Sequence, residues 1–191
     1  MKRGFTLVEL LVVITILAIL IGLSVAGVRT YQNRASDSQM RSMANIVASA
    51  AERYHSENNE YPSGTLVFGS APTNSPPASY QTASTRLEIP MSSFTNTNAK
   101  LVPCEGPVCS VPTPSPDKER VYYLTKSATE SASIRTYTIN TSCNYTFPST
   151  ETNGASFLVV YYSNEQAKWL ISRGAQGGAT APASPCSFTT L

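Results

Sequence analysis

Charged side chains are scarce in this sequence, and one long stretch has none. The chain has 191 residues, of which 14% are Asp, Glu, Lys or Arg, and residues 10–28 carry no charge at all. Histidine is scarcer still: His55 is the only one, and we interpret it as a solvated surface residue. No glycine-rich phosphate loop or nucleophile elbow accompanies it. We therefore expect no enzyme, no catalytic residue, no cofactor and no bound metal.

The charge balance argues against a general affinity for nucleic acid. The formal net charge of +2 comes from Lys2 and Arg3, and without them twelve basic side chains face twelve acidic ones. Binding to nucleic acid depends on an excess of Lys and Arg that neutralises phosphates. A local basic patch is still compatible with this balance, so nucleic acid is disfavoured as a partner rather than excluded.

The uncharged run is long enough to cross a membrane, since about 20 apolar residues span a bilayer. Lys2 and Arg3 precede it and favour a cytoplasmic N-terminus. A carboxylate costs roughly 2.5–3.5 kcal/mol at mid-bilayer, so Glu9 at the start of the run predicts a functional role with a partner. Two alternatives remain: a signal peptide cleaved after Ser24-Val25-Ala26, and a plain anchor, which leaves Glu9 unexplained.

Residues 2–10, Lys-Arg-Gly-Phe-Thr-Leu-Val-Glu-Leu, resemble the leader and first helix of type IV pilins and type II secretion pseudopilins. The resemblance implies that a prepilin peptidase cleaves between Gly4 and Phe5 and methylates the new N-terminal amine of Phe5. It also implies that Glu9 pairs with the N-terminal amine of a neighbouring subunit. Such a pair neutralises two charges that are each costly in hydrocarbon.

An amphipathic helix is predicted to continue the apolar run. Apolar residues recur at spacings of three and four between Met43 and Tyr54, and Asn58, Asn59 and Pro62 supply a stop. A helix from Phe5 to about Asn58 is roughly 80 Å long at 1.5 Å per residue. The resemblance implies that its first half anchors in the membrane and forms the filament core, while its second half packs on a globular head.

One position departs from the family's common pattern. Many major pilins carry a proline where Ala26 stands in this chain. Here only Gly22 and Gly27 weaken the helix, each by up to about 1 kcal/mol relative to alanine. Whether the helix melts between Gly22 and Gly27 in a filament is left open.

Beyond the helix, the sequence predicts a long loop followed by a sheet. Residues 63–116 hold nine prolines among many Ser, Thr and Asn residues, which predicts a loop with short strands at 65–68 and 87–89. Four runs rich in β-branched and aromatic residues predict strands at 120–126, 134–141, 156–163 and 168–172. Asn164-Glu165-Gln166 is predicted to be a hairpin turn, and the short connections favour antiparallel pairing.

The predicted fold is α+β: a long N-terminal helix, with a transmembrane half plus an amphipathic half, packed on an antiparallel sheet of about four strands, as in the pilin fold. The expected parts are a prepilin leader at 1–4, a transmembrane or filament-core helix at 5–28 and a globular head at 29–191. Within the head we expect an amphipathic helix at 29–58, a variable Pro/Ser/Thr-rich loop at 63–118, the sheet at 119–173 and a C-terminal tail at 174–191.

Four cysteines, Cys104, Cys109, Cys143 and Cys186, all lie beyond the membrane segment. An even number in an exported domain indicates disulfides, with three possible connectivities. We favour a local Cys104–Cys109 loop and a Cys143–Cys186 bridge that ties the tail to the sheet. Zinc is the alternative, disfavoured by the scattered spacing and the single histidine.

The leading hypothesis is a structural subunit that first crosses the membrane once and is then assembled into an extracellular pilus at the cell surface. The implied partners are other copies in a helical filament, the prepilin peptidase, an inner-membrane assembly platform with its ATPase, and membrane lipid before assembly. The output is adhesion, twitching motility or DNA uptake. The alternatives are a pseudopilin or minor pilin of a secretion machine, and a statically anchored extracellular binding module.

Overall fold

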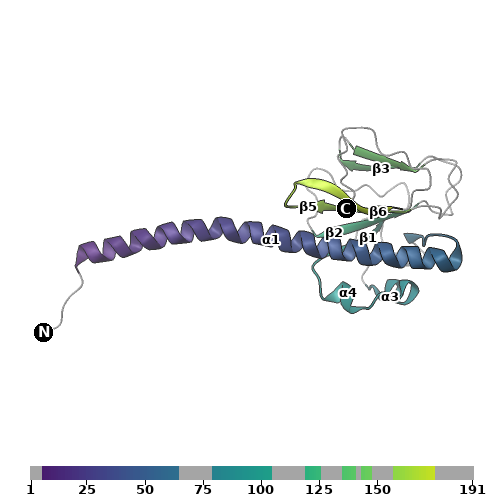
Figure 1. The fold of residues 1–191 in the computed structure, drawn as a ribbon, viewed down its shortest axis with the longest axis horizontal. Helices are drawn as coiled ribbons and strands as arrows, with labels where there is room; N and C mark the ends of the chain where they lie inside the picture. The colour runs from purple at the N-terminus through teal and green to yellow at the C-terminus, as the bar shows by residue number, and fades with distance from the viewer. Residues whose placement is uncertain are drawn as a thin grey trace.

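One helix much longer than the rest of the molecule dominates the computed structural model (Figure 1). The structure describes residues 6–64, 79–104, 119–125, 135–140, 143–147 and 157–174. Helix α1 spans Leu7–Asn58. Its C-terminal half lies between a sheet and two short helices, and its N-terminal half projects away from them (Figure 1).

Local capping defines both ends of α1. Thr6 is the N-cap, and its side chain and that of Glu9 form a capping box, which satisfies backbone N–H groups that lack a partner within the helix. At the other end Asn59 adopts a left-handed conformation with φ of 57°, and its N–H donates to the carbonyl of His55. The end predicted at Asn58 is confirmed, and the helix runs without interruption through Gly22 and Gly27.

The main sheet has four strands in the order β1-β2-β5-β6, with ranges Lys100–Cys104, Arg120–Thr125, Phe157–Ser163 and Lys168–Gly174. The α+β class and the four-stranded sheet are therefore confirmed. The purely antiparallel pairing is wrong for one pair, because β1 runs parallel to β2. The connection from β1 to β2 is long enough for the crossover that parallel strands need. The other two pairs are antiparallel, and the predicted turn at Asn164 joins β5 to β6.

The strand predicted at 134–141 does form, as β3 (Arg135–Asn140), but it lies outside the main sheet. It pairs with β4 (Cys143–Phe147), which the sequence did not predict, in a separate two-stranded sheet. The fourth place in the main sheet is taken by β1, in a segment predicted to be loop.

The described part of the predicted loop at 63–118 contains regular structure. Helices α3 (Gln81–Leu87) and α4 (Ser92–Thr95) precede β1 there. The short strand predicted at 87–89 is wrong, because Leu87 ends α3 and Glu88 caps it with φ of 51°. Ala83 and Leu87, four positions apart, are buried on one side of α3. The strand predicted at 65–68 lies outside the described residues.

The core fills the space between α1 and the helix-facing side of the sheet. Alternate strand residues such as Val121 and Tyr123 point toward α1, and their neighbours Tyr122 and Leu124 are equally buried on the other face. Burial on both faces explains why the strands read as continuous apolar runs rather than as an alternation. The helix contributes a stripe of buried residues that begins at Met40: Met40, Met43, Ala44, Val47, Ala48, Ala50 and Ala51.

Candidate assembly site

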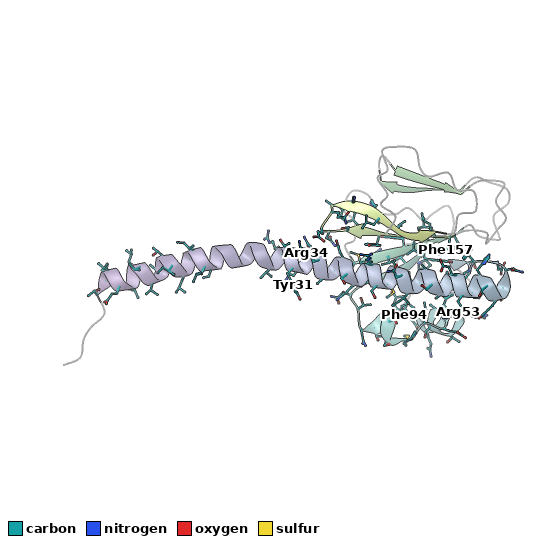
Figure 2. All side chains as sticks on the ribbon, in the orientation of Figure 1. Tyr31, Arg34, Arg53, Phe94 and Phe157 are labelled. Carbon is teal, nitrogen blue, oxygen red and sulfur yellow. The ribbon has the colours of Figure 1, made fainter. Side chains whose placement is uncertain are left out.

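The projecting half of α1, residues 7–28, is called the shaft below. Its described side chains, at 7–22 and 27–28, form an apolar surface that nothing covers. Its large side chains are exposed all round, from 46% at Val13 to 80% at Leu7, as the side-chain sticks along the shaft show (Figure 2). The helix holds an 18-residue window with a mean hydropathy of 2.8, none of it buried. A helix that is apolar on every side belongs in lipid or inside a bundle, so this half is suited to cross a membrane.

Glu9 lies in the first turn of this surface, where its own helix end occupies one carboxylate oxygen. Oε2 accepts hydrogen bonds from the backbone N–H of Thr6 at 2.8 Å and from the Thr6 hydroxyl at 2.7 Å. In return the Thr6 oxygen accepts from the Glu9 N–H at 3.3 Å. Within the described part of the chain, Oε1 accepts no hydrogen bond. Glu9 can therefore cap α1 and still offer a second oxygen to an external donor.

Gly4 and Phe5, the predicted cleavage and methylation positions, lie outside the described residues. Thr6 was missed as a functional residue, although the pattern Thr6-x-x-Glu9 before an apolar run is a recognisable capping signal. The one polar side chain deeper in the described shaft, Thr15, donates from its hydroxyl to the Val12 carbonyl at 2.8 Å. This bond satisfies the hydroxyl within the helix, as an apolar environment requires.

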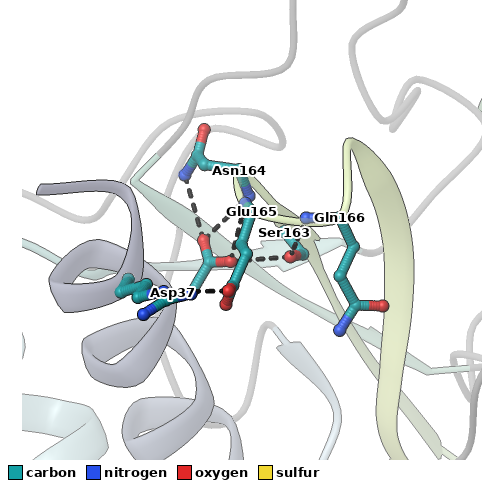
Figure 3. Close-up of polar contacts among 6 residues, drawn as sticks. Asp37, Ser163, Asn164, Glu165 and Gln166 are labelled. Atoms are coloured by element: carbon teal, nitrogen blue, oxygen red, sulfur yellow. Dashed lines mark hydrogen bonds and ion pairs between the residues drawn. The ribbon is translucent and has the colours of Figure 1, made fainter. Parts of the chain in front are cut away.

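A second cluster fixes the head to the helix where the shaft emerges (Figure 3). The Asp37 carboxylate receives the backbone N–H groups of Asn164 at 2.8 Å and Glu165 at 3.0 Å. It also accepts from the Ser163 hydroxyl at 2.6 Å and from the Asn164 side-chain amide at 3.2 Å. The β5–β6 turn thus closes around one carboxylate of α1. No signal in the sequence distinguishes Asp37 from the other polar residues of the helix.

Arg34, one turn before Asp37, reaches the same hairpin. Its Nε lies 2.9 Å from Oε1 of Glu165, with both side chains about half exposed or more. Exposed pairs of this kind contribute about 0–1 kcal/mol. The junction therefore depends on Asp37 more than on the ion pair.

Aromatic side chains pack together at the C-terminal end of α1. Tyr61 stacks on His55 with ring centroids 4.2 Å apart and contacts Phe157 at 4.6 Å. The Tyr123 hydroxyl donates to the Pro62 carbonyl at 2.9 Å. Tyr54 and Tyr61 are both partly buried against the core. His55 is half-buried in this stack rather than fully solvated.

On the side away from the sheet, α3 is tied to α1 through Arg53. Its guanidinium donates to the Leu87 carbonyl and lies 3.4 Å from the Glu88 carboxylate. A hollow of about 350 Å³ between α1 and the segment that follows α3 is lined by Asn45, Ser49, Ile89 and their neighbours. Among the described residues, no three His, Cys, Asp or Glu side chains gather into a group that could hold a metal.

Of the four cysteines, Cys104 alone has a described side chain. It ends β1, is fully buried and is disulfide-bonded. Cys109 and Cys186 lie outside the described residues, and only the backbone of Cys143 is described. The pairing of Cys104 with Cys109 and of Cys143 with Cys186 stays a prediction.

Comparison with known proteins gives two matches. Residues 1–25 match the family model of the prokaryotic N-terminal methylation motif. A segment of 76 residues is 36% identical to the type IV wide pilus major component PilA4 of Thermus thermophilus. This match covers 40% of the present chain and 58% of the relative's length. No solved structure matches the chain.

These findings support the type IV pilin family and confirm the resemblance that residues 2–10 indicated. The motif coincides with the shaft and with the Thr6–Glu9 helix start. The architecture of the described residues, a long N-terminal helix on a four-stranded sheet, is consistent with an α+β pilin fold.

Proposed function

We propose that this chain is the structural subunit of a type IV pilus-like filament, cleaved after Gly4, methylated at Phe5 and polymerised through its N-terminal helix. The observation that carries the proposal is the projecting half of α1, which is uncovered and apolar on all sides. In lipid this surface is solvated before assembly. In a filament the same surfaces of neighbouring copies cover one another, which exchanges one apolar environment for another.

Glu9 is the proposed assembly residue. Its exposed carboxylate lies in the first turn of α1, four residues after the position whose amine cleavage after Gly4 would create. Its Oε1 atom is available to the amine of a neighbouring copy while Oε2 keeps the helix cap. We propose the peptidase, the assembly platform and its ATPase as partners. This chain would be the substrate that they process and assemble.

A major pilin is favoured over a pseudopilin or minor pilin, because the Thermus thermophilus relative is named as a major component of a wide pilus. Adhesion, twitching motility and DNA uptake are the proposed outputs of such a filament. A static membrane-anchored binding module is the alternative from another class, and it predicts that the leader is retained.

The test is peptide mass spectrometry of filaments sheared from native cells. An abundant N-terminal peptide that begins at monomethylated Phe5 is the expected result. Glu9→Ala and Glu9→Lys variants should insert into the membrane normally and yield few filaments. Cleavage after Ala26, or an intact leader recovered only from membranes, would contradict the proposal. Normal filaments from both Glu9 variants would show that assembly does not depend on the Glu9 carboxylate.

A further inference from the structure

The exposed charges between residues 29 and 60, on α1 and just past its C-terminal end, are segregated along the helix axis. Near the point where the shaft leaves the head they are positive, and toward the distal end they are negative. We call the first group the basic collar and the second the acidic end. The basic collar is Arg29, Arg34 and Arg41, and the acidic end is Glu52, Glu57 and Glu60, all with exposed side chains.

Two charges of opposite sign interrupt this pattern, and the head holds both. Asp37 accepts its hydrogen bonds from the β5–β6 turn. Arg53, labelled near the distal end in Figure 2, donates to the carbonyl of Leu87 and pairs with Glu88. The segregation is therefore sharper among the charges that face outward than in the sequence.

Most of the outward charges have no ionic partner among the described residues of the head. Arg34 pairs with Glu165. In the part of the chain that the structure describes, Arg29, Arg41, Glu57 and Glu60 form no ion pair. These four side chains are therefore available to a partner, and the two signs call for a partner that carries both.

A second copy of the chain, displaced along the helix axis, carries both signs at the required spacing. At 1.5 Å per residue, Arg41 and Glu52 lie about 17 Å apart along the axis and Arg29 and Glu57 about 42 Å. Copies assembled from one membrane share one polarity, so the same face cannot pair with itself. Their contacts are heterologous, and heterologous contacts that do not close produce helical filaments.

We propose that the basic collar of one subunit contacts the acidic end of a neighbouring subunit that lies closer to the membrane. This inference rests on the proposed filament function and adds an ionic contact between heads to the contact at Glu9. Exposed ion pairs are individually weak, but complementary charges steer association and fix the register between surfaces. The contact would set the axial displacement between neighbouring heads.

Other kinds of partner would complement only one of the two charged groups. Anionic lipid headgroups or nucleic acid would suit the basic collar, but the acidic end would repel both. The charge balance of the processed chain likewise favours a partner that is neutral overall, as a second copy is.

The test is a charge swap in the full chain, with shear-released filaments as the readout. Arg29→Glu with Arg41→Glu, and separately Glu57→Lys with Glu60→Lys, should each lower the filament yield about tenfold. The four substitutions together should restore the yield to within about threefold of the original. Arg86→Glu, an exposed charge on α3, is the matched control and should leave the yield unchanged. Chain levels in the membrane and leader cleavage are measured for every variant.

Wild-type filaments provide a second measurement that needs no variant. Because the contact is exposed and ionic, raising the salt from about 0.05 M to about 0.5 M should shorten the filaments or lower their yield. Original yields from both reversed pairs, or failure of the fourfold variant to recover, would overturn the inference.

Other results distinguish a failure of this inference from a failure of the proposed function. Loss of filaments in the arginine variant alone, with binding of the chain's head region to phosphatidylglycerol but not phosphatidylcholine vesicles, would assign the collar to lipid and overturn the inference. Wild-type filaments that begin at methylated Phe5 would leave the proposed function standing in each case. If wild-type cells carry no such filaments, the proposed function itself is wrong.

Discussion

At the scale of single residues, Glu9 combines two roles that the geometry allows an experiment to separate. Its carboxylate caps α1 together with Thr6, and it offers a charge to a neighbour. A glutamine at N3 can still complete a capping box, whereas it carries no charge. A valine in place of Thr6 has the opposite effect, because it removes the cap oxygen and leaves the charge.

We expect Glu9→Gln to abolish most filament assembly while leaving the helix start intact. Thr6→Val should loosen the first turn by about 0.5–2 kcal/mol and retain most of the filament yield. The measurements are the yield of sheared filaments and the helix content of the chain in detergent micelles. Equal losses in both variants would mean that the cap, rather than the charge, limits assembly.

Burial of tyrosine hydroxyls makes the folded head sensitive to alkali. Burial raises the pKa of Tyr161, an effect that Arg41 opposes and Asp37 reinforces. Burial likewise raises the pKa of Tyr61 and of Tyr80. A phenol with a raised pKa stays protonated in the folded chain at a pH where the unfolded chain has already ionised. Its contribution is complete below about pH 10 and is lost as the pH rises through the folded pKa.

The unfolding midpoint in denaturant should therefore fall as the pH rises above about pH 10. Tyr161→Phe should make this fall shallower, since within the described residues its hydroxyl makes no hydrogen bond and the substitution removes little else. Fluorescence of Trp169, the only tryptophan, reports unfolding because the side chain is buried in the sheet. An unchanged pH dependence in the variant would show that other groups cause the alkaline loss.

At the scale of elements, the β5–β6 hairpin is held to α1 by one carboxylate. Asp37→Asn replaces an acceptor of four hydrogen bonds with an amide whose nitrogen faces donors. Bonds to a charged group contribute about 1.5–3 kcal/mol each, and we expect a loss of stability in this range for the full chain in detergent. Arg34→Gln, which removes only the exposed ion pair, should cost no more than about 1 kcal/mol. Similar losses in the two variants would contradict the central role of Asp37.

The elements that sequence reasoning predicted share a strong local signal. The shaft has an unbroken apolar run, the helix end has two asparagines and a proline, and strands β2, β5 and β6 have dense β-branched and aromatic residues. Each of these signals arises within the element itself. They were sufficient for the α+β class and for the position of Glu9 in the first turn.

The elements that were missed depend on partners distant in the sequence. Strand β1 contains Pro103 and is short, and its composition does not indicate that it pairs with β2. Helix α3 has one turn of apolar spacing, Ala83 and Leu87, which gains its stability from packing on α1. The role of Asp37 cannot be recognised from the sequence around it, because the turn that binds it follows 126 residues later.

At the scale of the whole molecule, α1 divides its length between two environments. Residues 7–21 contribute no buried side chain, whereas the core stripe begins at Met40. Deletion of residues 1–28 therefore removes the polymerising surface without removing a core contact. The Asp37 junction and the partly buried Asn33 and Ser36 remain in the shortened chain.

We expect the chain without residues 1–28 to be a folded monomer in water, with the denaturant midpoint of the full chain in detergent. Sedimentation velocity and Trp169 fluorescence measure the two properties. A longer deletion, through residue 43, is the matched comparison: it removes Met40 and Met43, each worth about 2–5 kcal/mol as a buried side chain, and should not fold. If the shorter deletion also fails to fold, the shaft contributes to the head and the two halves of α1 are not independent. If it folds and stays monomeric, assembly depends on the removed shaft, and contacts between heads, including the basic collar with the acidic end, act only on subunits that the shaft has already brought together.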